Sequence, residues 1–170
     1  MSVLSHDPLY PRDLAGYAGN PPSVCWPDNS RIAVQFVLNF EEGGENCVLH
    51  GDTTSETHLT DLGGQSVAIS GRNLSIESIF EFGSRTGFWR LHDLFVENEV
   101  PVTVFGVGMA LQRNPRVVTA MLKARWEIAS HGWRWINYRD VPKEVEEEHV
   151  HHVLNYFDRE IGYRPSDIPS

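Results

Sequence analysis

Two apolar runs constrain the fold of this chain most, because each has the composition of a strand that is buried on both faces. The first is "RIAVQFVLNF" at residues 31–40, and the second is "VPVTVFGVG" at residues 100–108. Such continuous apolar strands are typical of parallel sheets. A shorter strand is expected at about residues 126–130. The sequence therefore predicts three parallel strands.

Segments with the apolar spacing of helices follow each of these strands. We expect a helix capped by Ser75 and a second helix over about residues 87–98. Asn114 before Pro115 is a strong start for a third helix, because proline fits the first helical position. A fourth helix is expected within residues 142–165. Alternating strands and helices predict an α/β fold with a parallel sheet and right-handed crossovers.

The helix expected within residues 142–165 is amphipathic. Its predicted buried stripe consists of Val150, Val153, Leu154, Phe157 and Ile161. Three histidines fall outside this stripe, and we expect them on solvated surface: His149, His151 and His152.

By composition, the chain divides into three parts. Residues 1–30 are rich in Pro, Gly, Ser and Asp, and are expected to form an extended lead-in. Residues 31–165 hold every predicted strand and helix, and residues 166–170 form an atypical tail. Three strands cannot close a barrel, whose eight-stranded form needs about 250 residues. We therefore expect an incomplete barrel and a chain that is cut short.

Charge and composition argue against several classes of partner. The 170 residues include 14 basic and 23 acidic side chains, and the net charge of -9 disfavours nucleic acid. No apolar window approaches the roughly 18 residues of a membrane span, and no signal-peptide pattern opens the chain. Cys25 and Cys47 lie in no metal-type spacing. The prediction is a cytoplasmic protein with free thiols and no membrane partner.

Polar motifs follow two of the predicted strands, at the strand ends where parallel α/β sheets bind ligands. Glu41-Glu42 follows the first strand, and "SHGWRW" at residues 130–135 follows the third. A carboxylate beside an imidazole is a reasonable acid/base set. Only one of two adjacent carboxylates can point straight into a cleft, because side chains alternate along a strand. The alternative is a solvated strand end at the glutamates and a local turn at His131.

Two tryptophans in the same motif favour a binding role. Trp133 and Trp135 flank an arginine directly after a His-Gly turn. Exposed aromatic side chains on a loop suit a flat ring substrate. The alternative is that both rings pack on the next helix as part of the core.

Five motifs, in order, resemble one known family. "VLNFEEGGEN", "FEFGSRTGFWRL", "VTVFGVGMALQRNP", "EIASHGWRWINY" and "GYRP" are similar to the polysaccharide-deacetylase (NodB-homology) superfamily. They resemble most its metal-independent, PuuE-type allantoinase branch. The resemblance covers about residues 1–165 and implies a distorted (β/α) barrel. It also implies hydrolysis of a cyclic amide C–N bond, with allantoin opened to allantoate.

The resemblance also implies roles for individual residues. Metal-dependent members carry an Asp-Asp pair after the first strand and two histidines four residues apart after the third. This chain has Glu41-Glu42, His131 and Trp135 at those positions, so a divalent metal keeps at most two protein ligands. Catalytic zinc sites normally retain three, and a site without metal or other cofactor is therefore expected. Glu41 matches the catalytic-base position, and Glu42 or His131 is expected to orient the substrate or protonate the leaving nitrogen.

Two arginines are candidates for stabilising a carbonyl or an oxyanion. Arg85 lies in "EFGSRTGFW", where a helix-surface ion pair is the alternative, and Arg164 begins the Arg-Pro motif. With Trp133 and Trp135 they complete the expected substrate-binding set.

Three hypotheses about function follow. The leading one is an allantoinase-like hydrolase whose partner is a small cyclic ureide. The second is a metal-dependent N-deacetylase of N-acetylated sugars, against which Trp135 argues. The third is that the chain is not an enzyme but a fragment, which is inactive, a truncated gene product, or stable only when it pairs with another chain. A homo-oligomer is expected, because a sheet with unpaired edges favours association.

Overall fold

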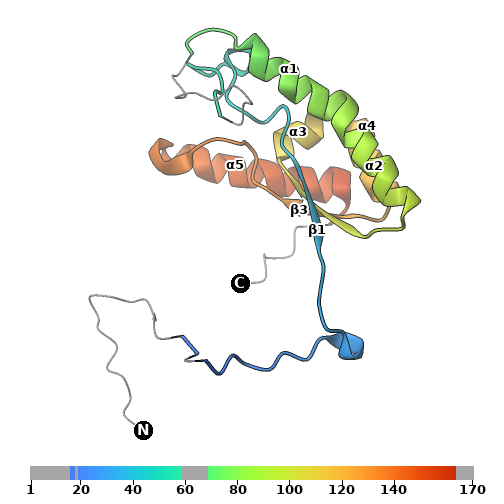
Figure 1. Cartoon of the computed structure of the whole chain (residues 1–170). Helices are drawn as coiled ribbons and strands as arrows, with labels where there is room; N and C mark the ends of the chain where they lie inside the picture. Colours follow the sequence, from blue (N-terminus) through green and yellow to red (C-terminus); the bar gives the residue numbers. More distant parts are fainter. Residues whose placement is uncertain (1–15, 18, 59–68, 164–170) are drawn as a thin grey trace, which may run out of the picture. The chain divides into compact units, whose positions relative to one another are not determined.

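The computed structural model describes residues 16–17, 19–58 and 69–163 (Figure 1). The chain divides into two compact units, Met1–Val34 and Gln35–Ser170. In the described part of the first unit every side chain is exposed, and a 3-10 turn lies at Pro27–Asn29. The second unit contains the sheet and the helices.

A parallel sheet in the order β1-β2-β3 forms the centre of the second unit. Its strands are β1 (Phe36–Phe40), β2 (Val102–Gly106) and β3 (Glu127–Ser130). Helices fill both crossovers, so the predicted α/β fold with a parallel sheet is confirmed. The sheet is not closed within the described residues, because β1 and β3 each have a single neighbour.

Five α-helices lie in the described part of this unit. They are α1 (Leu74–Phe82), α2 (Phe88–Glu97), α3 (Gly108–Arg113), α4 (Pro115–Lys123) and α5 (Lys143–Tyr156). A π-type turn, Gly83–Gly87, joins α1 and α2 into one continuous helix, and a second, Phe157–Ile161, extends α5. The predicted start of α4 at Asn114-Pro115 is confirmed. Short 3-10 turns lie at Val48–His50 and Tyr138–Asp140.

One face of the sheet is packed and the other is partly open. Val104 and Ile128 are register neighbours, and both are almost completely buried, as is Phe40. Between these positions the side chains point to the other face, where Phe105 is half-buried and Val37 is 45% exposed. The prediction that the strands are buried on both faces is therefore wrong. Helices cover one face, and the described residues leave the other partly uncovered.

The outer edge of β3 is covered by a tyrosine. The hydroxyl of Tyr163 accepts a hydrogen bond from the backbone N–H of Ile128 at 2.9 Å. It also donates one to the carbonyl oxygen of the same residue at 3.0 Å. One side chain therefore satisfies both backbone groups of Ile128 on the side away from β2.

The first helix begins two residues earlier than a cap at Ser75 would require. Asn73 is the N-cap of α1, and its side-chain oxygen accepts a hydrogen bond from the backbone N–H of Ile76 at 3.4 Å. Ser75 lies inside α1, so the prediction that it caps the helix is wrong. Asparagine caps as well as serine does, and sequence spacing alone did not separate the two.

The buried stripe of α5 differs from the predicted one. Val153, Phe157 and Ile161 are buried as expected, but Val150 is 50% exposed and Tyr156 is buried. α5 packs on α3, and the contact uses the later part of α5. Because α3 has six residues, it covers only part of the longer helix.

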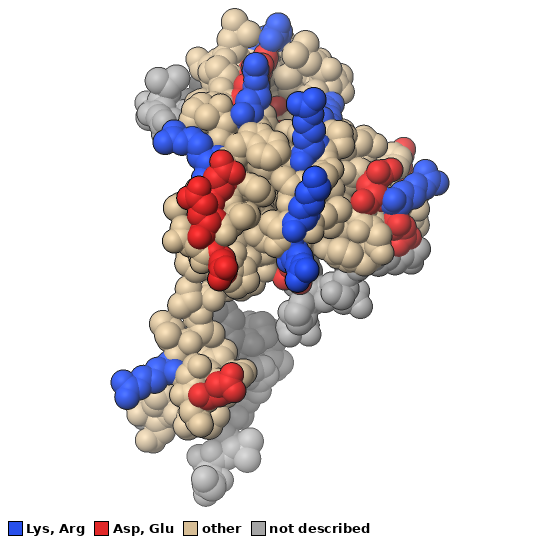
Figure 2. Space-filling model, turned by 90° about the vertical axis from the view of Figure 1, so that its right-hand side faces the viewer, with Lys and Arg blue, Asp and Glu red and all other residues tan. Residues whose placement is uncertain are grey.

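The face drawn in Figure 2 carries Lys and Arg side chains near Asp and Glu side chains, with neutral surface between them. Both cysteines are free, with Cys47 buried and Cys25 exposed. Among the described residues, no helix combines the length and the apolar character needed to cross a bilayer. The absence of nucleic-acid and membrane partners and the cytoplasmic location stay predictions.

Candidate active site

Glu41 and His131 meet on the open face of the sheet. Each follows the last residue of a strand, and these last residues, Phe40 and Ser130, share a register row through Gly106. Because side chains alternate, the next residues of β1 and β3 point to the same side. His131 Nε2 lies 3.1 Å from Glu41 Oε1. The structure thus brings two of the predicted catalytic residues into contact.

The His131 ring is held from two directions. It stacks on Phe105 with 5.9 Å between ring centroids and 17° between ring planes. Its backbone N–H donates to the carbonyl oxygen of Gly106 at 2.9 Å. The next residue, Gly132, has a φ of 78°, which a glycine adopts without strain, and the chain turns there towards α3. His131 is therefore fixed by the end of β2 and by the turn that follows it.

Glu42 points to the helix side of the sheet instead. Its Oε1 lies so close to Gly83 that a Cβ on that glycine would be 2.3 Å away. Its Oε2 accepts a hydrogen bond from the backbone N–H of Glu41 at 3.1 Å. Burial raises the pKa of Glu42 above its ordinary value of 4.5, and backbone hydrogen bonds only partly offset this effect. The two adjacent carboxylates are separated, as alternation predicts.

Both tryptophans of "SHGWRW" are half-buried and pack against the core. The centroids of the Trp133 and His152 rings are 5.3 Å apart. The Trp133 ring also packs on Gly108, in the space that a Cβ would occupy. The Trp135 ring meets Phe80 edge-on at 6.3 Å. These contacts are those of the packing alternative, and substrate binding by either ring stays a prediction.

Among the described contacts, none joins a candidate arginine to Glu41 or His131. Arg85 Nη1 lies 3.0 Å from Glu81 Oε2, four residues earlier, and its side chain is 75% exposed. This is the helix-surface ion pair that the sequence left open as the alternative. Arg164 lies outside the described residues.

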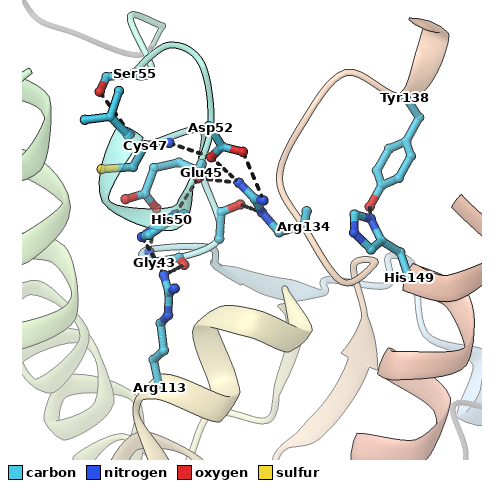
Figure 3. A network of polar contacts seen from close by, with 12 residues as sticks. Gly43, Glu45, Cys47, His50, Asp52, Ser55, Arg113, Arg134, Tyr138 and His149 are labelled. Atoms are coloured by element: carbon cyan, nitrogen blue, oxygen red, sulfur yellow. Dashed lines mark hydrogen bonds and ion pairs between the residues drawn. The ribbon is translucent and has the colours of Figure 1, made fainter. Parts of the chain in front are cut away.

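The sequence did not predict a role for Arg134, which lies at the centre of a partly buried polar network (Figure 3). Its side chain is only 9% exposed and pairs with Asp52, with Nη2 2.6 Å from Oδ2. It also donates to the carbonyl oxygens of Gly44 at 3.2 Å and Glu45 at 3.0 Å. The available signal in the sequence was a charged residue placed between two tryptophans.

A second arginine, Arg113, also contacts the loop after β1. Arg113, the last residue of α3, donates to the carbonyl oxygen of Gly43 and contacts His50 Nε2 at 2.6 Å. His50 Nδ1 lies 3.0 Å from the carbonyl oxygen of Glu45. Glu45 is buried and accepts a hydrogen bond from the backbone N–H of Gly43 at 2.6 Å. The described part of the polar loop after β1 is therefore a packed and hydrogen-bonded structure.

One of the α5 histidines differs from its predicted environment. His149 is half-buried, and its Nδ1 lies 2.9 Å from the hydroxyl of Tyr138. Burial lowers the pKa of His149 below 6.5, and the positive charge of Arg134 adds to this effect. The expectation of solvated surface is therefore wrong for His149, whereas His151 and His152 are exposed as predicted.

The residues at the superfamily's metal positions do not make a metal site. Glu42 and His131 could donate to a metal ion, but Trp135 could not. Glu42 faces the helix, and His131 contacts Glu41. Within the described ranges, no group of three or more His, Cys, Asp and Glu side chains could hold a metal ion.

Sequence comparison gives two matches. Residues 71–167 match the family described as "Polysaccharide deacetylase". A protein of Schizosaccharomyces pombe (strain 972 / ATCC 24843), named "Putative polysaccharide deacetylase", is 50% identical over 141 residues. That alignment covers 82% of this chain and 44% of the yeast protein.

Two solved structures are similar to this chain in both fold and sequence. The crystal structure of PuuE allantoinase is 47% identical, with a TM-score of 0.83, and covers 92% of this chain and 52% of its own. The "probable polysaccharide deacetylase" of Pseudomonas aeruginosa PAO1 is 50% identical, with the same TM-score and coverage. This chain thus spans about half the length of the relatives that it matches. With more than half of its residues matched by the family and half of the aligned residues identical to the yeast relative, the chain belongs to the polysaccharide deacetylase family.

Proposed function

We propose that this chain carries a hydrolase site that opens the ring of a cyclic amide, with allantoin as the leading substrate. The observation that carries the proposal is the 3.1 Å contact between Glu41 and His131. The pair lies beyond the carboxyl ends of parallel strands, where sheets of this type bind their ligands. The likeness to PuuE allantoinase supports the substrate class.

A carboxylate and an imidazole at this distance can divide the acid and base steps between them. Glu41 takes a proton from water, whose oxygen forms a bond with the ring carbonyl carbon. Protonated His131 gives its proton to the ring nitrogen as the C–N bond breaks. The proton on Glu41 then returns to His131 across their contact, which restores the starting state. The product carries a carboxyl group and a freed N–H.

The other candidate residues have supporting roles in this proposal. Glu42 faces the helix and binds the backbone N–H of Glu41, so we assign it to holding Glu41 in place. The half-buried rings of Trp133 and Trp135 would contact a flat substrate with their exposed parts. Arg85 must leave Glu81 before it can stabilise a carbonyl oxygen.

The test measures turnover of allantoin, hydantoin and succinimide by the chain and its variants. Glu41→Gln should lower kcat by about 10²- to 10⁴-fold, the usual contribution of a general base. Glu144→Gln, an exposed carboxylate of α5, is the matched control and should leave kcat unchanged. Turnover by Glu41→Gln equal to that of the wild-type chain would remove Glu41 from the base role.

Metal-dependent N-deacetylation is the second candidate, because the family and two close relatives bear the name polysaccharide deacetylase. The same chain is assayed with N-acetylated sugars, with and without a chelator. Allantoin turnover that survives the chelator supports the first proposal, and chelator-sensitive deacetylation supports the second. A wild-type chain that turns over none of these substrates would contradict both and favour an inactive fragment.

A further inference from the structure

We propose that Arg134 is a positioning residue, whose guanidinium joins the loop after β1 to the loop after β3 and so sets the distance between Glu41 and His131. This inference rests on the proposed function of that pair. It concerns a residue that none of the superfamily's catalytic positions includes, since Arg134 lies between His131 and Trp135.

Four hydrogen bonds connect the guanidinium to the first loop. Nε donates to Gly44 O at 3.2 Å, and Nη2 donates to Glu45 O at 3.0 Å. Nη1 and Nη2 donate to the two carboxylate oxygens of Asp52, at 3.3 and 2.6 Å. An arginine that binds a carboxylate with two nitrogens is held in orientation as well as in distance. Figure 3 shows these bonds converging on Arg134 from one side.

The Asp52 partner remains ionised at neutral pH. Burial raises the pKa of Asp52, but the hydrogen bonds from Arg134 and from the backbone N–H of Cys47, with the charge of Arg134, lower it more. The net pKa is below 3.8. The link between the loops is therefore a partly buried ion pair at neutral pH, and removing Asp52 leaves the guanidinium of Arg134, only 9% exposed, without its counter-charge.

Short turns connect the residues bonded to Arg134 with Glu41 and His131. The backbone N–H of Gly44 donates to Glu41 O at 2.8 Å, so Gly44 and Glu41 belong to one tight turn. Gly44 O accepts a second bond from the backbone N–H of Trp135 at 2.9 Å. On the other loop, the backbone of Trp133 is fixed to Met109 at the start of α3. A shift of the guanidinium is therefore passed to Glu41, while His131 stays with β2.

The first experiment observes His131 directly and needs no activity. The ¹⁵N signals of its imidazole are compared by NMR in wild type, Arg134→Gln, Asp52→Asn and Glu41→Gln. In Arg134→Gln and Asp52→Asn these signals should move towards those of Glu41→Gln, because the contact between Glu41 and His131 is lost. Arg72→Gln is the matched control, since Arg72 binds Glu77 with two hydrogen-bonded oxygens but is half exposed. Wild-type His131 signals in a folded Arg134→Gln chain would overturn the proposal.

The second experiment separates positioning from simple stabilisation. Arg134→Gln should lower kcat by about 10- to 100-fold, the scale of a 1 Å misplacement, with a smaller change in KM. Arg134→Lys keeps the charge and should recover part of kcat. Equal losses for Lys and Gln, in chains that both melt cooperatively, would count against a charge-based link. If Arg134→Gln does not fold, Asp52→Asn supplies the same comparison.

The two experiments also distinguish this inference from the function on which it rests. A wild-type chain without turnover contradicts the proposed function, and the NMR comparison still decides whether Arg134 sets the pair. Active wild type with an unaltered Arg134→Gln contradicts the inference alone.

Discussion

Gly83 matters at the residue scale because of the atom that it lacks. It has helical backbone angles, with φ -54° and ψ -55°, and Glu42 Oε1 occupies the space where its Cβ would lie. Gly87, at the other end of the same π-type turn, is also helical, but its Cβ would make ordinary contacts of 3.7 Å or more. The two glycines therefore form a natural pair for comparison.

Gly87→Ala should stabilise the chain by up to about 1 kcal/mol, the usual gain of alanine over glycine in a helix. Gly83→Ala should gain less, because the Glu42 carboxylate must turn out of its buried position. It should also lower turnover at least about 10-fold, through the loss of support for Glu41. Urea unfolding and steady-state kinetics measure the two effects. Equal stabilisation at both positions, with unaltered turnover, would contradict this account.

Glu42 also predicts a pH dependence of stability. Its folded pKa is raised above 4.5, so it contributes stability that is complete below pH 4.5 and is lost as the pH rises through the folded pKa. Glu42→Gln is neutral at every pH. The free energy of unfolding of Glu42→Gln, relative to wild type, should therefore increase as the pH rises from 4.5 through the folded pKa of Glu42. Chemical unfolding at a series of pH values measures it, and a difference that does not increase with pH would contradict the prediction.

The proximity of Glu41 and His131 could be predicted from the sequence because local rules suffice for it. Alternation along β1 and β3 places Glu41 and His131 on one side of the sheet, and parallel pairing brings the strand ends together. The partners of Arg134 lie 82 to 90 residues away in the sequence, and no local pattern encodes such contacts. The contact of His149 with Tyr138 was missed for a related reason, because a loop shields what the helical pattern alone leaves in solvent.

The cap of α1 is the clearest prediction at the element scale. Asn73 accepts a hydrogen bond from Ile76 and donates one from Nδ2 to Glu56 O at 2.9 Å, which ties the helix to the loop after β1. Asn73→Ala should cost about 1 kcal/mol of unfolding free energy. Ser75→Ala should change it by less than about 0.5 kcal/mol, because Ser75 is within the helix. A larger cost at Ser75 than at Asn73 would reverse the assignment of the cap.

Strand identity and strand environment were predictable to different degrees. Composition was sufficient to locate β1, β2 and β3 approximately, since β-branched and aromatic residues favour strands. The first strand was predicted to begin at residue 31, but β1 begins at Phe36, and the exposed residues 31–35 are not part of the sheet. Whether a strand is covered on one face or two depends on its neighbours in space. α3 escaped prediction because six residues are too short for a helical pattern to be recognised. Its absence from the prediction also explains the error in the stripe of α5, which packs on it.

At the scale of the whole molecule, the described residues leave one edge of the sheet uncovered, at β1, and one face partly uncovered. On β1, Phe36 is 43% exposed and Val37 is 45% exposed. We predict that the chain forms a homo-oligomer through the exposed part of β1. Sedimentation velocity measures the oligomeric state. Val37→Lys should shift the distribution towards monomer, whereas Val96→Lys, an equally exposed residue of α2, should not. A wild-type chain that sediments as a monomer would contradict the prediction.

The hydroxyl of Tyr163 makes the two edges of the sheet differ in their ability to pair with a further strand. At β3 it already occupies the donor and acceptor of Ile128 that an added strand would use. Growth of a fibril from that edge must therefore first expel the phenol, which adds a barrier to templated aggregation. The edge of β1 has no such tyrosine among the described contacts. Misassembly of this chain should accordingly be directional, with β1 as the end from which aggregates extend.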